Sequence, residues 1–172
     1  MEENLGVYFD TSLTMERQVH AIAKACYYQI RNIGHVRRYI TLDACKTLAH
    51  ALITSRLDYG NALLYGLPST LMTRLQKVQN SSGRLVTHTH KREHITPVLN
   101  SLYWLPVIYR SQYNILMSTF KALRGNVPQY LEELVVPYQL TRSLQSESGP
   151  FLTIPTTRGV TYGNRFISYQ AP

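Results

Sequence analysis

Ser55-Arg56-Leu57-Asp58-Tyr59-Gly60-Asn61-Ala62-Leu63-Leu64-Tyr65-Gly66-Leu67-Pro68 is the centre of the stretch that decides the fold, which runs from Leu42 to Asn80. Before this centre, Thr41 is placed as an N-cap and apolar residues recur at helical spacing, namely Cys45, Leu48, Ala49, Leu52 and Ile53. After a turn at Gly-Leu-Pro-Ser, Ser69 can cap a second helix with the apolar positions Leu71, Leu75 and Val78. The pattern predicts two helices joined by a sharp turn.

The segments before this hairpin predict a strand and a further helix. Residues 5–10 are short, β-branched and aromatic, which is typical of a strand, and its hydrogen-bonding partners are expected upstream of the sequence. From Thr14 to Ile33, apolar residues again follow helical spacing, and Gly34 is expected to end that helix. The run Asn80-Ser81-Ser82-Gly83 is expected to fray or bend the later helix, because Gly and Ser are poor helix formers.

Beyond the hairpin, three more short helices are predicted. Thr96-Pro97 starts the first, and Leu105-Pro106 precedes the second, which Gly125 ends. The second carries an apolar stripe that we interpret as core, comprising Tyr109, Tyr113, Leu116, Met117, Phe120 and Leu123. The third follows Val127-Pro128. After Tyr138 the composition turns to Ser, Thr, Gly and Pro, which indicates a linker, with a short strand at 151–155.

The fold class predicted is therefore mainly α, a helical bundle with a short N-terminal strand and an irregular, weakly stranded C-terminal tail. We divide the sequence into residues 1–13 for the strand, 14–137 for the helical domain and 138–172 for the tail. Cys26 and Cys45 lie at apolar helical positions and indicate buried thiols of a reducing compartment. A signal region and a membrane span are both lacking, which favours an intracellular location.

The charge distribution indicates what kind of ligand the protein contacts. From Thr14 to Arg92, 12 Lys and Arg face three Asp and Glu, so this part holds the whole +8 excess of the chain. A basic surface of this kind is typical of proteins that contact phosphate groups, although solvated helix faces would give the same count. The overall content of charged residues, 16%, is low and suggests that a partner covers part of the surface.

The sequence offers little that would support catalysis. It has no nucleophile elbow, no phosphate-binding Gly-rich loop and no dinucleotide fingerprint, and its ten acids are scattered. Asp58 lies late in its helix, where a negative charge opposes the dipole, so we expect a salt bridge to Arg56 or to a basic residue of the next helix. His88, His90 and His94 leave open a zinc site, although the cations Lys91 and Arg92 between them favour a basic loop.

Several motifs in one order carry a resemblance to a known family. They are Leu5-Gly6-Val7-x-Phe9-Asp10, Ser55-Arg56-Leu57-Asp58-Tyr59-x-Asn61 with Gly66-Leu67-Pro68, Leu75-Gln76-x-Val78-Gln79-Asn80, His94-Ile95-Thr96-Pro97-Val98-Leu99 and Leu102-x-Trp104-Leu105-Pro106-Val107. Phe120-Lys121-Ala122-Leu123 and Pro128-x-Tyr130-Leu131 continue the match. The chain resembles the C-terminal region of reverse transcriptases of LINE-type non-LTR retrotransposons, after the polymerase palm.

The resemblance implies a helical, thumb-like region that holds the primer-template duplex, RNA–DNA or DNA, while the palm lies upstream. The catalytic carboxylates of the family belong to an aromatic-x-Asp-Asp motif, and this sequence contains no adjacent Asp-Asp. We therefore expect a non-catalytic fragment of an RNA-directed DNA polymerase, from a truncated copy of the element, that needs no cofactor or metal. In this interpretation residues 1–13 are a remnant of the palm edge.

Eight basic residues are the candidate nucleic-acid contacts: Arg31, Arg37, Arg38, Arg74, Lys77, Arg84, Lys91 and Arg92. Asp58 is assigned a structural role in bracing the hairpin, and Trp104 and Phe120 are assigned to the core. Two alternatives stay open. The chain is a helical protein–protein interaction module without nucleic-acid binding, or it is a metallohydrolase built on the three histidines.

Overall fold

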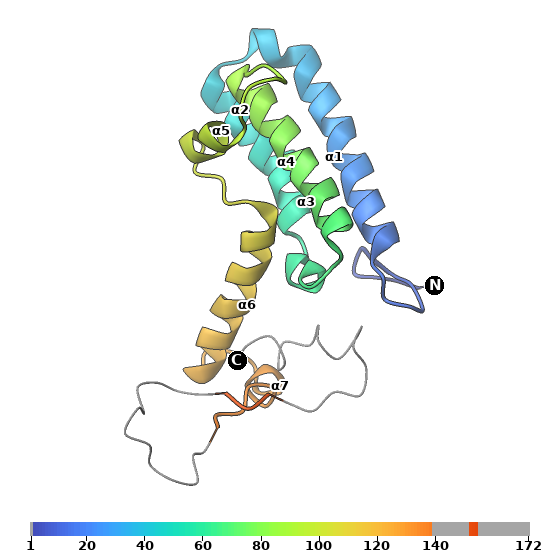
Figure 1. Ribbon diagram of the computed structural model, residues 1–172, viewed down its shortest axis with the longest axis vertical. Coiled ribbons are helices and arrows are strands. Elements are labelled where there is room, and N and C mark those ends of the chain that lie inside the picture. Colours follow the sequence, from blue (N-terminus) through green and yellow to red (C-terminus); the bar gives the residue numbers. More distant parts are fainter. Residues whose placement is uncertain (1, 139–151, 155–172) are drawn as a thin grey trace. The chain divides into compact units, whose positions relative to one another are not determined.

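The computed structural model describes residues 2–138 and 152–154, and the architecture is mainly helical, as predicted (Figure 1). Contacts divide the chain into two compact units, Met1–Ser111 and Gln112–Pro172, and each is considered by itself. The domain boundaries at residues 13 and 137, which were predicted from the sequence, stay a prediction. In the described part of the chain, no helix is both long and apolar enough to cross a membrane.

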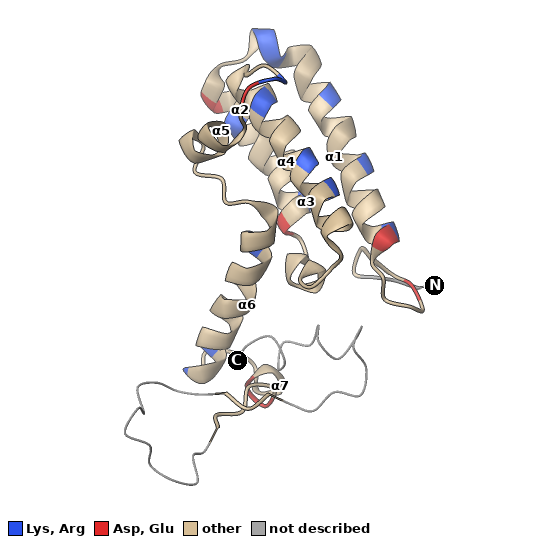
Figure 2. Ribbon diagram, in the orientation of Figure 1, with Lys and Arg blue, Asp and Glu red and all other residues tan. Residues whose placement is uncertain are grey.

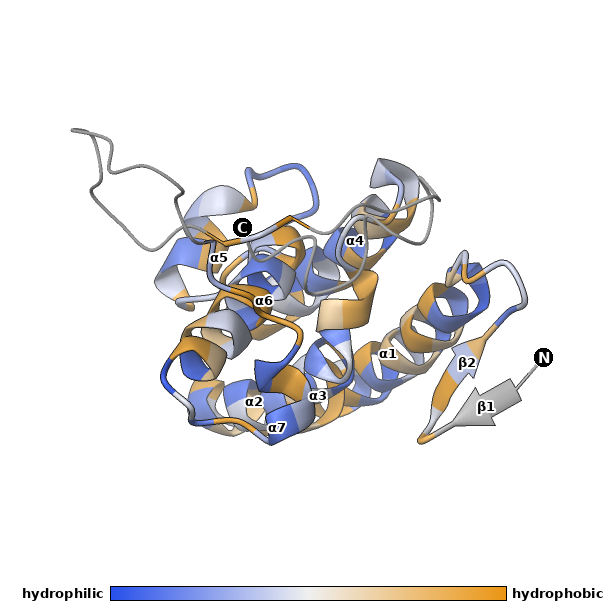
Figure 3. Ribbon diagram, turned by 90° about the horizontal axis from the view of Figure 1, so that it is seen from below, coloured by the Kyte–Doolittle hydropathy of each residue, from blue (hydrophilic) through white to orange (hydrophobic). Residues whose placement is uncertain are grey.

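The N-terminal strand has a partner within the chain, so the prediction that its partners lie upstream is wrong. Strands β1 (Glu2–Asn4) and β2 (Val7–Phe9) pair antiparallel, with Glu3 opposite Tyr8. Leu5 and Gly6 both have positive φ, which is the backbone of a two-residue hairpin turn. The hairpin lies beside the first turns of α1 (Figure 3), where the Tyr8 amide donates to Gln18 Oε1 at 3.1 Å.

Helix α1 (Glu16–Val36) is longer than predicted, because it continues through Gly34. Gly34 is exposed, and a Cβ there would meet only the Leu85 side chain of α4 (Ser69–Thr87), at 3.8 Å. A single 3₁₀ turn, η1 (Arg37–Tyr39), then leads to the central hairpin.

The first arm of the central hairpin is one continuous helical path, as predicted, but its middle is wider than an α-helix. It consists of α2 (Leu42–Ala49), the π-helical segment η2 (His50–Thr54) and α3 (Ser55–Asp58). Thr41 caps it, because its side chain accepts from the Ala44 amide at 3.2 Å. The connection to α4 is longer than the expected turn, since it contains the 3₁₀ helix η3 (Asn61–Leu64), with positive φ at Gly60 and Gly66.

Helix α4 runs unbroken through Asn80-Ser81-Ser82-Gly83, so the predicted fraying is wrong. A Cβ at Gly83 would lie 3.5 Å from Val98 and 3.6 Å from Leu99 of α5 (Thr96–Ser101), and Ser82 is fully buried. The small side chains therefore let α5 pack closely on α4. This packing, which local propensity does not report, keeps the helix intact.

The core of the first unit lies between α1, the α2–α3 arm, α4 and α5. Its fully buried side chains include Val19, Ile53, Leu75, Val78 and Val86. Trp104 is 4% exposed, as expected of a core residue, and its Nε1 donates to His50 Nε2 at 3.3 Å. The two rings meet edge to face, with centroids 5.5 Å apart.

Both cysteines lie in this core, and burial raises the pKa of each thiol, that of Cys26 to about 11. A raised pKa leaves almost no thiolate near neutral pH, and the thiolate is the reactive form. We expect neither thiol to react with iodoacetamide at neutral pH in the folded protein, and both to react once guanidinium unfolds it. Intact-mass measurement follows the reaction, and rapid alkylation of the native protein would contradict the burial.

In the apolar stripe predicted as core on α6 (Val107–Leu123), Met117 is half-buried and the other five side chains are exposed, so the assignment of Phe120 to the core is wrong. Phe120 is 48% exposed, with the Arg124 guanidinium 4.1 Å from its ring centroid. The buried positions form another stripe: Val107, Ser111, Ile115, Thr119 and Ala122. The Thr119 hydroxyl donates to the Ile115 carbonyl at 2.9 Å, which satisfies a polar group on the buried face.

The second unit contains the rest of α6 and α7 (Gln129–Glu132). Gly125 ends α6 with φ +67°, as predicted. Pro137 and Leu152 form an antiparallel bridge, and the Thr153 amide donates to the Val136 carbonyl at 2.8 Å. The strand expected at 151–155 stays a prediction, because Leu152 forms only this isolated bridge and Phe151, Pro155 and most of the predicted tail lie outside the described residues.

Candidate nucleic-acid interface

Helices α1 and α4 run side by side in the same direction (Figure 1). His20 hydrogen-bonds Arg74 near the start of both helices, and Gly34 lies against Leu85 near their ends. The two helices together carry a single acid, Glu16, at the first residue of α1. The outer surface of this pair, hereafter the α1–α4 face, is therefore strongly basic (Figure 2).

The α1 side of this face is a row of exposed side chains. Arg17, Lys24 and Arg31 are exposed and recur every seven residues, which spaces them about 10.5 Å apart on one side of the helix. Tyr28, 62% exposed, lies four residues beyond Lys24 on the same side. Lys24 and Arg31 make no hydrogen bond or ion pair to any residue that the structure describes.

The α4 side contributes Arg74 and Lys77, both exposed. Their side chains face solvent, whereas Leu75, Val78 and Gln79 of the same helix are buried. The contact between Arg74 and His20 joins the two rows, because it brings an exposed side chain of each helix together. The predicted contacts Arg31, Arg74 and Lys77 thus share one face of the first unit.

Arg37 was predicted to contact nucleic acid but does not belong to this interface. Its side chain is buried, with Nε donating to the Leu85 carbonyl at 3.1 Å and Nη2 to the Val86 carbonyl at 2.8 Å. Nη1 donates to the Ile40 carbonyl at 3.2 Å. The bonds to Leu85 and Val86 satisfy carbonyl groups of the last turn of α4, which have no partner within their own helix. The role of Arg37 is therefore structural.

Arg84 is also held by the protein rather than presented to solvent. It is half-buried, and Nη2 donates to the Glu93 carbonyl at 2.9 Å, which fastens the loop after α4. Lys91 and Arg92 of that loop are exposed. Arg38 is exposed too, with its guanidinium 4.9 Å from the Tyr39 ring centroid. These three cations lie in the segments that follow α4 and α1 and extend the basic surface beyond the helices.

Asp58 has the structural role expected, but with a different partner. Both of its carboxylate oxygens accept from Arg110 Nη1, at 2.9 and 2.8 Å. Arg110 lies in α6, 52 residues away, whereas the expected partners were Arg56 or a basic residue of the next helix. The ion pair compensates the unfavourable charge at the end of α3.

The described residues include no cluster that would bind a metal ion. No group of three His, Cys, Asp or Glu side chains gathers as a metal site would require anywhere in residues 2–138 and 152–154. His88, His90 and His94 are exposed along the loop after α4, so the structure gives the metallohydrolase alternative no support. Asp10, the other isolated acid, accepts from the Thr14 hydroxyl, which lowers the pKa of the carboxyl.

Sequence reasoning missed Arg17 and Lys24 as candidate contacts, and it also missed Arg56 as an exposed cation outside this face. The signal for the first two was present, because their spacing of seven from Arg31 places all three on one side of a helix. No such pattern marks Arg56, whose position depends on how α3 packs beside α1.

The fold and the site define a helical domain with a basic two-helix face. No family model, curated protein or solved structure matches the chain.

Proposed function

We propose that the α1–α4 face binds the phosphate backbone of nucleic acid without catalysis. The observation that carries the proposal is the parallel packing of α1 and α4, which gathers exposed cations from both helices with a single acid at one end. Cations at this density attract phosphates and release counterions when they bind. Such contacts position a duplex and read no bases, so the binding is indifferent to sequence.

The resemblance to the post-palm region of LINE-type reverse transcriptases supports an RNA–DNA or DNA duplex as the ligand. In this proposal the chain is a non-catalytic fragment whose helical unit holds the duplex. The relevant cations are Lys24, Arg31, Arg74 and Lys77, with Arg38, Lys91 and Arg92 at the end of the face. Arg37 and Arg84 support the interface from within the fold.

The triple variant Lys24→Gln, Arg31→Gln, Lys77→Gln is expected to bind a fluorescein-labelled RNA–DNA hybrid more weakly than the wild type. Each phosphate contact contributes about 0.9 to the slope of log K against log salt, so loss of three contacts lowers that slope by about 2 to 3. Fluorescence anisotropy over a series of KCl concentrations measures both quantities. A second hybrid of unrelated sequence should give the same affinities.

A matched variant that removes three cations elsewhere, Lys46→Gln, Lys121→Gln, Arg124→Gln, separates the face from net charge. It should retain the wild-type salt slope, because these residues lie on α2, on α6 and just after α6. Equal losses in the two triple variants, or no binding of the wild type at low salt, would contradict the proposal.

A protein–protein interaction module is the second candidate, and the exposed face of α6 in the second unit favours it. Tyr113, Leu116 and Phe120 are each about half exposed and lie on one side of the helix. Large apolar side chains gathered on a surface are typical of contact sites. Analytical ultracentrifugation that shows self-association of a chain with no affinity for the hybrid would favour this candidate over the first.

A further inference from the structure

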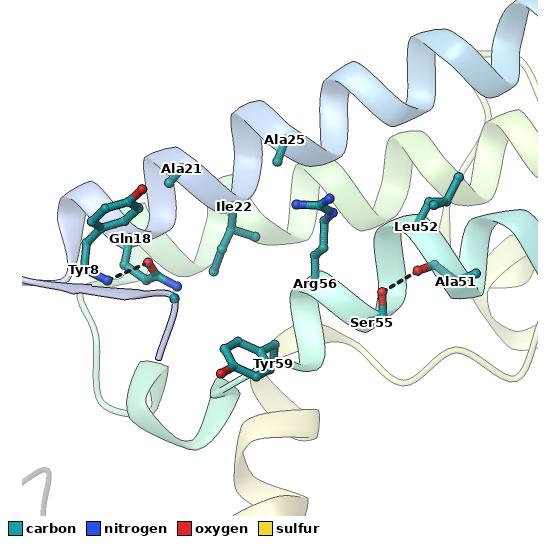
Figure 4. A pocket seen from close by; sticks show the side chains of 11 residues that line it. Tyr8, Gln18, Ala21, Ile22, Ala25, Ala51, Leu52, Ser55, Arg56 and Tyr59 are labelled. Carbon is teal, nitrogen blue, oxygen red and sulfur yellow. Dashed lines mark hydrogen bonds between the residues drawn. The ribbon is translucent and has the colours of Figure 1, made fainter. Parts of the chain in front are cut away.

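A groove opens between the β1–β2 hairpin, α1 and the η2–α3 segment of the first unit (Figure 4). Its volume is about 630 Å³, in the range of small-molecule sites. It lies on the flank of α1 lined by Ala21 and Ala25, whereas Gly34 on another side of α1 meets α4. The groove is thus separate from the contact between α1 and α4.

Small side chains create the space. Ala21 and Ala25 of α1 and Ala51 and Ser55 of the η2–α3 segment all line the groove, and their side chains are too small to fill it. The π-helical turn η2 immediately precedes α3, and π-turns of this kind often occur at functional sites. The wall is completed by Ile22 and Leu52 and is largely apolar.

Arg56 is the one formal charge among the residues that line this groove. Its side chain extends from α3 toward α1 near Ala25, as Figure 4 shows. It makes no hydrogen bond or ion pair to the described residues, whereas Arg37 donates to backbone carbonyls and Arg110 to the Asp58 carboxylate. A planar guanidinium that presents free N–H groups in an apolar groove suits a phosphate oxygen pair.

Two aromatic rings lie at the hairpin end of the same groove. Tyr59 is 54% exposed, and its hydroxyl donates to the Leu5 carbonyl at 2.5 Å, which fixes the ring. Tyr8 is half-buried, with the Arg17 guanidinium 4.8 Å from its ring centroid. Ordered tyrosine rings beside a basic group offer a stacking surface to a nucleobase.

We propose that this groove binds a nucleotide, with its phosphate on the Arg56 guanidinium and its base against the Tyr8–Tyr59 end. The charge of Arg56 matches the phosphate, the tyrosine rings match the base, and the volume of the groove suits a small molecule. The site does not depend on the proposed function of the α1–α4 face, because Arg56 is not among the cations assigned to it.

The test is isothermal titration calorimetry with AMP, using adenosine and inorganic phosphate as half-ligands. AMP should bind saturably and more tightly than either half. Arg56→Met, which keeps the apolar stem and removes the charge, should weaken AMP binding about tenfold or more. Ala25→Leu, which fills the groove, should also abolish binding, with circular dichroism confirming that each variant is folded.

Arg31→Met is the matched control, since it removes an exposed arginine from α1 outside the groove. It should leave AMP affinity unchanged while weakening binding of the RNA–DNA hybrid. The proposal is overturned if AMP does not bind, if Arg56→Met binds it as well as the wild type does, or if inorganic phosphate binds as tightly as AMP. Failure of the hybrid to bind, with AMP binding intact, would remove only the function proposed for the α1–α4 face.

Discussion

Replacing Arg37 with methionine is expected to lower the free energy of unfolding by about 3 kcal/mol. Methionine keeps most of the buried apolar stem but removes the guanidinium, which donates to the carbonyls of Ile40, Leu85 and Val86. The carbonyls of Leu85 and Val86 belong to the last turn of α4, where no amide of the helix reaches them. A positive charge at that end also interacts favourably with the helix dipole.

Arg38→Met is the matched control for this effect. Arg38 is the adjacent residue, carries the same charge and is exposed, so its loss should change the free energy of unfolding by no more than about 0.5 kcal/mol. Urea denaturation followed by circular dichroism measures both variants. If the two differ by less than 1 kcal/mol (roughly the worth of one hydrogen bond), the buried network of Arg37 does not stabilise the fold as described.

Trp104→Ala is expected to cost about 3 to 5 kcal/mol, as large-to-small replacements of buried aromatic residues do. The indole is 4% exposed and packs with the core cluster of the first unit, and its N–H donates to His50. Removing it leaves a cavity between the α2–η2 arm and the chain after α5. The midpoint of thermal unfolding should fall steeply.

Two further variants divide this effect into its parts. Trp104→Phe retains most of the apolar area and loses the hydrogen bond to His50, so it should cost about 1 to 2 kcal/mol. Tyr103→Ala alters the neighbouring residue, which is 95% exposed, and should be close to neutral. A Trp104→Ala variant as stable as Tyr103→Ala would show that Trp104 is not part of the core.

In the central hairpin, the spacing of apolar residues correctly predicted the buried helix faces. The apolar spacing of Cys45, Ala49, Ile53, Leu75 and Val78 predicted which faces of the two arms are buried, and all five are buried in the core. Thr41 was predicted to cap the first arm and does. These features are local, because a helix repeats every 3.6 residues and its cap lies within one turn.

Features that depend on contact between distant segments were not predictable in this way. On α6, periodicity predicted that the aromatic stripe belongs to the core, but that stripe is largely exposed and the stripe of Val107, Ser111, Ile115, Thr119 and Ala122 is buried. Gly83 was expected to weaken α4, but it allows α5 to approach. In both cases, close packing against another element determined the structure. The sequence of one helix does not show which residues pack against it, so neither feature could be predicted from it.

In the candidate site, too, some features followed from the sequence and others depended on tertiary contacts. By itself, the sequence determined that residues 14–92 hold the excess positive charge, that the chain is mainly helical and that Trp104 belongs to the core. Only the tertiary structure decided which cations face solvent, because Arg31, Arg37 and Arg56 look alike in the sequence. The carbonyls of Leu85 and Val86 that hold Arg37 lie 48 and 49 residues away, and the carboxylate of Asp58 pairs with Arg110 across 52 residues, whereas no described residue pairs with Arg56. The reason is physical: a charged side chain becomes structural or available according to the partners that folding brings to it.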